Sequence, residues 1–213
     1  MERLWMDEKC GREDGSREDY WEPATYEETQ KGIQGLSLRT KHFSNRKLFL
    51  TGEVTEKMAN DFVSELLYLA EDPEPIDIYI NSPGGSVDAG LVIYDVIQAC
   101  KEKMEINMYC IGNAASMGAV ILAGGAKGHR YILPHSRVMI HEPLITGGFG
   151  GSASNIKKCA DSILETKKKL NEILAKHTGK TVKEIDKATS FDNYLSAEEA
   201  IEFGLCDEIR NVI

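Results

Sequence analysis

The 213-residue chain carries 34 acidic and 25 basic residues, a formal net charge of −9, and 42% hydrophobic residues. This length suits one well-packed domain, and the apolar content is ordinary for a globular protein. A net negative surface repels nucleic acid and anionic membranes, so both kinds of partner are disfavoured.

Cysteine usage and the start of the chain bear on the compartment. The five cysteines are odd in number, irregularly spaced and without a Cys-x-x-Cys pair, so they indicate neither a disulfide framework nor a zinc site. They are Cys10, Cys100, Cys110, Cys159 and Cys206. The acidic N-terminus lacks the basic start and apolar stretch of a secretory signal, and no apolar run of about eighteen residues predicts a spanning helix. We therefore expect reduced thiols and a cytoplasmic location.

In chain order, residues 1 to about 30 are polar, and we expect a flexible acidic arm over 1–26 followed by a single domain over 27–213. Strands are expected over 47–50, 76–80, 105–111, 129–133 and 137–141. Helices are expected after Thr55 and over 87–99, 116–126 and 153–177, followed by two more helices and a last strand. This alternation predicts an α/β domain with parallel strand pairing.

Two of the expected helices show apolar residues at helical spacing, which predicts a buried face on each. In the helix after Thr55 these residues are Met58, Phe62, Val63, Leu66 and Leu67. In the long helix over 153–177 they are Ile156, Cys159, Ile163, Leu170 and Leu174.

Ser116 lies in the stretch IGNAASMGAV, where a buried strand is expected to turn into a helix. Such a turn points the hydroxyl outward, and the following backbone N–H groups favour negative charge nearby, which suits a nucleophile that attacks a carbonyl. The alternative is an ordinary helix N-cap. The surrounding residues only approximate the Gly-x-Ser-x-Gly nucleophile pattern.

His141 and Asp192 are candidates for the base and the acid that a serine nucleophile needs. His141 ends an apolar strand, where it is either a general base facing a cleft or a structural hydrogen-bonding group. Its neighbour Glu142 is not assigned as the orienting acid, because adjacent strand residues point to opposite faces. Asp192 precedes a helix capped at Ser196, and its alternative role is that of a cap or turn residue.

Gly84 and Gly85 lie in the stretch NSPGGSVDAG, between a strand and a helix. Paired glycines allow close backbone approach, as in phosphate-binding loops. However, the chain contains neither Gly-x-x-x-x-Gly-Lys-Ser/Thr nor Gly-x-Gly-x-x-Gly, so a backbone N–H of Gly85 that donates to an oxyanion fits better than a nucleotide site.

Several blocks together resemble the ClpP family, the proteolytic subunits of Clp protease. They are YINSPGGSVDAG, GNAASMGA, GAKGHRYILPHSRVMIHEP, HTGK and FDNYLSAEEAIEFGLCDEI. The resemblance runs almost without gaps from about Glu27 to Ile209, and the blocks keep the family's order and spacing. It implies an α/β fold of the ClpP/crotonase type, with repeated β-β-α units and a protruding handle helix at about 147–180.

By this resemblance Ser116 is the nucleophile, His141 the base and Asp192 the acid of a Ser-His-Asp triad, with backbone N–H groups of Gly85 and Met117 forming the oxyanion hole. The implied activity is that of a serine endopeptidase. The chain order Ser–His–Asp differs from the order Ser–Asp–His of α/β-hydrolases, which counts against a lipase or esterase of that fold.

The resemblance also implies an assembly and its partners. The handle helix would interlock two stacked heptameric rings that enclose the active sites, and residues 147–154 would line the substrate by strand addition. An AAA+ unfoldase would thread unfolded protein into the chamber and would use ATP, since this chain has no Walker motif. The chain itself is expected to need neither cofactor nor metal.

The chain departs from the family pattern at several positions. Phe191 replaces the arginine that usually precedes the triad aspartate and joins contacts between the rings. Ala188 replaces an acid, Glu142 a glutamine and Asn113 another glutamine, and the segment 32–48 differs near the unfoldase docking surface. Two alternatives therefore stay open: a catalytically silent ring subunit that works with an active paralogue, and a crotonase-type enzyme acting on coenzyme A thioesters.

Overall fold

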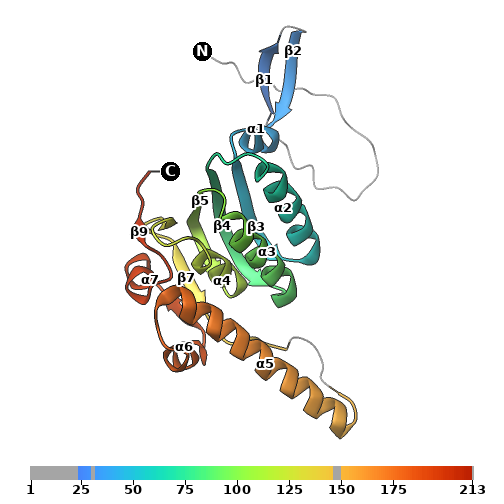
Figure 1. Cartoon of the computed structure of the whole chain (residues 1–213), viewed down its shortest axis with the longest axis vertical. Helices are drawn as coiled ribbons and strands as arrows, with labels where there is room; N and C mark the ends of the chain where they lie inside the picture. The colour runs from blue at the N-terminus through green and yellow to red at the C-terminus, as the bar shows by residue number, and fades with distance from the viewer. Residues whose placement is uncertain (1–23, 30–31, 146–149, 213) are drawn as a thin grey trace, which may run out of the picture. The chain divides into compact units, whose positions relative to one another are not determined.

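The computed structural model describes residues 24–29, 32–145 and 150–212 (Figure 1). Most of the expected arm over 1–26 lies outside the described residues, as do residues 146–149 at the expected start of the handle. The chain divides into two compact units, Met1–Lys47 and Leu48–Ile213.

The first unit contains a β-hairpin and a short helix. Strand β1 (Ala24–Thr29) pairs antiparallel with strand β2 (Gly32–Ser37), so that Ala24 lies opposite Ser37. Helix α1 (Leu38–Ser44) begins where the Ser37 hydroxyl accepts a hydrogen bond from the Thr40 N–H at 3.1 Å. Residues 24–26 of the expected arm therefore belong to a strand.

The second unit is built on a seven-stranded sheet in the order β3-β4-β5-β6-β9, with β7 paired to β5 and β8 paired to β7. The strands are β3 (Lys47–Val54), β4 (Ile76–Gly85), β5 (Ile106–Ala115), β6 (Arg130–Ile132), β7 (Arg137–Ile140), β8 (Asn193–Leu195) and β9 (Glu208–Ile209). Strands β4, β5, β6 and β9 pair in parallel, as does β7 with β5, whereas β8 is antiparallel to β7. The α/β class with a mostly parallel sheet is confirmed.

Strand β5 organises the sheet because it carries two partners in succession. Its residues 108–110 pair with β6, and its residues 113–115 pair with β7. The chain therefore brings β7, and the residue that follows it, alongside the carboxyl end of β5. The sequence predicted β5 only to residue 111, because the small residues 112–115 carry no strand signal.

The helices of this unit begin at polar N-cap residues, and most of them bury one face, whereas α4 is buried along its whole length. They are α2 (Glu56–Leu69), α3 (Val87–Cys100), α4 (Met117–Ala123), α5 (Ala153–Thr178), α6 (Val182–Thr189) and α7 (Ala197–Phe203). In α2 the predicted buried face is confirmed for Phe62 and Leu66, but Leu67 is exposed because it lies off the buried stripe.

Helix α5 has two different halves. Leu170 and Leu174 are buried near its C-terminal end, whereas Ile156 and Cys159 are exposed. Residues 153–162 are all exposed, and Figure 1 shows this end of α5 extending beyond the sheet. The continuous apolar stripe predicted for this helix is therefore buried only in its second half.

Candidate active site

Ser116 lies at the junction between β5 and α4 and has an unusual backbone conformation. Its φ is +52° and its ψ is −120°, and among the described residues only Ser116 and Arg46 are non-glycine residues with positive φ. The Ser116 N–H donates to the Met139 carbonyl of β7 at 2.8 Å. Such conformations cost free energy and persist where the surrounding structure enforces them, commonly at functional sites.

The hydroxyl of Ser116 does not act as a helix cap. Ser116 occupies the N-cap position of α4, yet its side chain makes no capping hydrogen bond. The N-cap side chains of the other helices in this unit do accept one, and they are Thr55, Ser86, Ser152, Thr181 and Ser196. Instead, the Ser116 Oγ lies 2.8 Å from the Nε2 of His141. The N-cap alternative for this side chain is wrong.

His141 follows β7 directly and connects two side chains. Its Nε2 contacts the Ser116 Oγ, and its Nδ1 lies 3.1 Å from the Oδ1 of Asp192. The side chain is 16% exposed. Because a carboxylate only accepts hydrogen bonds, Nδ1 carries the proton in the neutral ring, which leaves the lone pair of Nε2 directed at the serine hydroxyl.

Asp192 reaches this position through the short strand β8. Antiparallel pairing of β8 with β7 places Asn193 opposite Ile140, so the residue before Asn193 lies beside the residue after Ile140. A backbone hydrogen bond also joins the segment after His141 to the segment before Asp192: the Glu142 N–H donates to the Thr189 carbonyl at 2.7 Å. Asp192 is 58% exposed, so solvent reaches the carboxylate on its outer side.

Glu142 does not orient His141. Its carboxylate pairs with Lys167 of α5, with 2.9 Å between Nζ and Oε2. As expected, Glu142 is not the partner of His141, and among the residues that the structure describes Asp192 is the side chain hydrogen-bonded to Nδ1.

The glycine pair ends β4 next to Ser116. A Cβ on Gly84, whose φ is +91°, would lie 2.6 Å from the Ser116 Cβ and 2.7 Å from the Ala115 carbonyl oxygen, so only glycine fits. A Cβ on Gly85 would instead meet the backbone of Val54. The closest approach to Ser116 therefore belongs to Gly84, which the sequence did not single out from its neighbour, while the oxyanion role of Gly85 stays a prediction.

Met117, the other predicted oxyanion residue, begins α4 directly after Ser116. Its side chain is buried, and a Cβ on Gly90 would lie 2.4 Å from the Met117 Cε, so α3 and α4 pack closely there. The Met117 side chain thus anchors the turn, and its backbone N–H is part of the first turn of α4.

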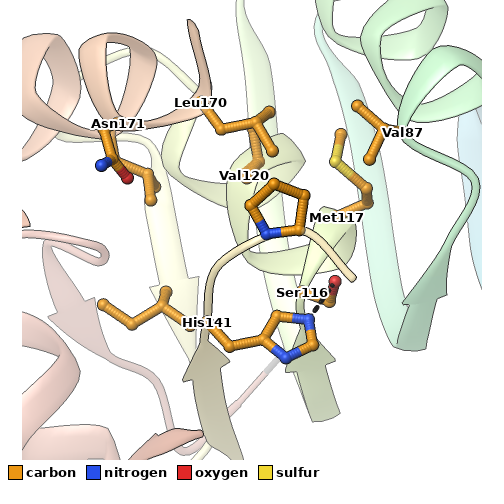
Figure 2. Close-up of a pocket in the computed structure, with 10 residues that line it drawn as sticks. Val87, Ser116, Met117, Val120, His141, Leu170 and Asn171 are labelled. Carbon is orange, nitrogen blue, oxygen red and sulfur yellow. Dashed lines mark hydrogen bonds between the residues drawn. The ribbon is translucent and has the colours of Figure 1, made fainter. Parts of the chain in front are cut away.

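A small pocket opens beside the Ser116 hydroxyl, and its walls are mainly apolar (Figure 2). They are formed by Val87, Ser116, Met117, Val120, Ile140, His141, Pro143, Leu170, Asn171 and Leu174. Figure 2 shows the His141 ring against Ser116, with Leu170 and Asn171 approaching from α5. The sequence assigned Leu170 and Leu174 to a buried helix face by their spacing, and nothing in the pattern pointed to a pocket wall.

The described parts of the chain contain no group of three or more His, Cys, Asp or Glu side chains arranged to hold a metal ion. Across the same residues, no helix combines the length and the apolar character needed to cross a bilayer. The four described cysteines are unpaired, and burial raises the pKa of the Cys110 thiol to about 11, which favours its protonated form.

The chain was compared with known protein families. A family model described as Clp protease matches residues 30–212, which covers β2 through β9 and all three residues of the Ser116, His141 and Asp192 set.

Proposed function

From the premise that this chain belongs to the Clp protease family and is therefore a peptidase, we propose that it is a serine endopeptidase subunit with Ser116 as its nucleophile. One observation carries this proposal: His141 joins Ser116 on one nitrogen and Asp192 on the other. The mostly parallel α/β sheet is consistent with the ClpP fold that the sequence implied.

The proposed reaction begins with proton transfer. The His141 Nε2 takes the proton of the Ser116 hydroxyl as the oxygen attacks a peptide carbonyl, and His141 later donates that proton to the leaving amine. Asp192 keeps the proton of the neutral ring on Nδ1 and stabilises the imidazolium. A water molecule, activated by the same histidine, then hydrolyses the acyl-enzyme.

The oxyanion of the tetrahedral intermediate needs donors on the far side of the attacked carbon. We assign this role to the backbone N–H groups of Gly85 and Met117, which lie in the segments on either side of the Gly84–Ser116 contact. The apolar pocket lined by Val87, Val120 and Leu170 would receive a side chain of the substrate.

The family assignment also suggests the context of this reaction. We propose that two stacked heptameric rings enclose the sites and that an AAA+ Clp-type unfoldase delivers unfolded polypeptides at the expense of ATP. The exposed first half of α5 supports a contact with another subunit, because Ile156 and Leu164 face solvent there.

A second candidate is a catalytically silent or conditionally active ring subunit that works with an active paralogue. The observation that favours it is Phe191, which is 85% exposed beside Asp192 and cannot make the ionic contacts of the family's arginine. A crotonase-type activity on coenzyme A thioesters is less well supported, because it does not require the Ser-His-Asp set.

Fluorophosphonate labelling of the full chain, with the modified peptide located by mass spectrometry, tests the proposal. We expect modification at Ser116 and none in Ser116→Ala, and peptide hydrolysis by Ser116→Ala should fall by about a millionfold. Hydrolysis by Ser116→Ala near the wild-type rate would contradict the assignment. A folded, ring-shaped wild-type protein without label would favour the silent subunit.

A further inference from the structure

Three charged side chains from three separate segments meet next to the triad. Lys167 of α5 places its Nζ 2.9 Å from the Oε2 of Glu142 and 2.9 Å from the Oδ1 of Asp186. Glu142 is the residue directly after His141, and Asp186 lies in α6, the helix that precedes Asp192. The lysine therefore bridges the chain segments that carry the base and the acid.

Further hydrogen bonds tie the backbone of Glu142 to the end of α6 and to the segment that carries Asp192. The Glu142 N–H donates to the carbonyl of Thr189, a fully buried residue three positions before Asp192. The Thr189 hydroxyl donates to the Ile185 carbonyl at 2.9 Å, within α6. A shift of Glu142 would thus move the backbone on both sides of the His141–Asp192 hydrogen bond.

Helix α5 is also part of the pocket, and Lys167 shares a face with the residues that line it. Asn171, one turn after Lys167, lines the pocket and donates from its Nδ2 to the same Asp186 Oδ1 at 3.2 Å. Leu170, three positions after Lys167, lines the same pocket. The position of α5 is therefore linked to the pocket by Leu170 and Asn171 and to the triad segments by Lys167.

We propose that Lys167 is a positioning residue, which holds His141 and Asp192 at their catalytic separation by bridging Glu142 and Asp186. This inference rests on the proposed function of the Ser116, His141 and Asp192 set. Removal of the lysine charge would leave two carboxylates facing each other without a cation, and their repulsion would separate the two segments.

The electrostatics of the bridge support a lysine that stays charged. Hydrogen bonds to Glu142 and Asp186 raise the pKa of the Lys167 ammonium above its ordinary value. The same contact with Lys167 lowers the pKa of Asp186. Both shifts favour the ionised forms of Lys167 and Asp186, and the single ammonium lies 2.9 Å from each of two carboxylates, which distinguishes the bridge from an isolated surface ion pair.

The test compares Lys167→Met with Lys167→Arg and with Lys168→Met in the full chain. Lys168 is a matched control, because it is the next residue of α5, is 75% exposed and makes only a 3.9 Å approach to Glu172 among the described residues. For a fluorogenic peptide we expect Lys167→Met to lower kcat about ten- to a hundredfold with KM within about twofold. Lys167→Arg should restore most of the rate, and Lys168→Met should match the wild type.

Crystal structures of the same variants provide a readout that does not depend on activity. In Lys167→Met we expect the distances from His141 to Ser116 and to Asp192 to lengthen beyond hydrogen-bonding range, while both persist in Lys168→Met. Thermal unfolding of each variant separates this effect from a loss of fold, since a folded Lys167→Met protein is required for either comparison. If it does not fold, the same two readouts on Lys167→Gln decide the question.

The outcomes separate this inference from the proposed function. Wild-type labelling at Ser116 together with unchanged kcat and unchanged triad distances in Lys167→Met would overturn the positioning role alone. An unlabelled wild-type Ser116 would overturn the proposed function, and the triad distances would then decide the role of Lys167. Equal losses of kcat in Lys167→Met and Lys168→Met would also overturn the positioning role of Lys167.

Discussion

Among the pairs of a basic side chain and an aspartate in the second unit, Arg130–Asp207 and His141–Asp192 have sharply different surroundings. Arg130 is 3% exposed and pairs with Asp207 through its Nε at 2.8 Å and through its Nη2 at 2.5 Å. Its Nη1 donates to three backbone carbonyls, those of Ala123, His177 and Gly204. Asp207 also accepts the backbone N–H groups of Gly128 and Arg130.

The His141–Asp192 pair has a single hydrogen bond between its side chains, and its carboxylate is largely exposed. The comparison contrasts a structural pair with the pair that we propose to be reactive. Each of the three guanidinium nitrogens of Arg130 donates a hydrogen bond to a fixed partner, so the pair holds the C-terminal segment against β6. His141 instead shares its two nitrogens between Asp192 and Ser116, so only one of them holds the aspartate.

Of the changes made to these two pairs, loss of the Asp192 carboxylate should have the greatest effect. Asp192→Asn should lower kcat by about ten-thousandfold, because an amide that donates to Nδ1 stabilises the wrong tautomer of His141. Because Asp192 is exposed, the free energy of unfolding should change by less than about 0.5 kcal/mol. Peptide hydrolysis and urea unfolding of the same preparation measure both values. A kcat within tenfold of wild type would show that Asp192 does not orient the histidine.

The second change removes the guanidinium of the structural pair. Arg130→Met should lower the free energy of unfolding by about 4 kcal/mol, since it leaves Asp207 and three carbonyls without their buried donor. Lys127→Met is the control, because Lys127 is exposed nearby, and it should change the same quantity by less than about 0.5 kcal/mol. Urea unfolding measures both values. A loss under 1 kcal/mol for Arg130→Met would contradict the role of Arg130 as the buried donor to Asp207 and the three carbonyls.

The smallest predicted effect is a pH dependence of stability caused by His177, whose backbone carbonyl accepts a hydrogen bond from Arg130. Burial, together with the charges of Lys101, Lys176 and Arg130, lowers the pKa of His177 to about 4. The ordinary value is about 6.5, so between these values the unfolded chain binds more protons than the folded one. The associated stability is complete above pH 6.5 and should fall by about 2 kcal/mol as the pH falls to 4, less than the roughly 3 kcal/mol of an unscreened group, because solvent screens the half-buried ring.

Unfolding measured across this pH range in wild type and in His177→Gln tests the assignment. The variant loses the contact of the imidazole with Tyr94, whose hydroxyl lies 2.7 Å from Nε2, so it should be less stable than the wild type above pH 6.5. Its stability should nevertheless depend less steeply on pH between 6.5 and 4. His135→Gln, at an exposed position, should keep the wild-type slope, and equal slopes in all three proteins would rule out His177 as the source.

Sequence patterns predicted the elements well where they depend on local chemistry. Apolar runs predicted β3, β4, β6 and β7 within a few residues, and the caps Thr55 and Ser196 mark the starts of α2 and α7. The hairpin of β1 and β2 was not predicted, because its residues are mostly polar and its strands pair only with each other. The apolar spacing also predicted buried residues in the first half of α5, where Ile156 and Cys159 are in fact exposed.

For the site, the types and order of the available residues could be read from the sequence, and resemblance assigned Ser116, His141 and Asp192 their expected roles. Their meeting depends on the packing of the sheet, because β5 pairs with β7 and β7 with β8, and strand pairing joins residues far apart in the chain. Tertiary packing also brings Gly84 close to Ser116 and lets Lys167 bridge Glu142 and Asp186. Local patterns carry no record of such contacts, since a distance between side chains depends on how whole elements pack.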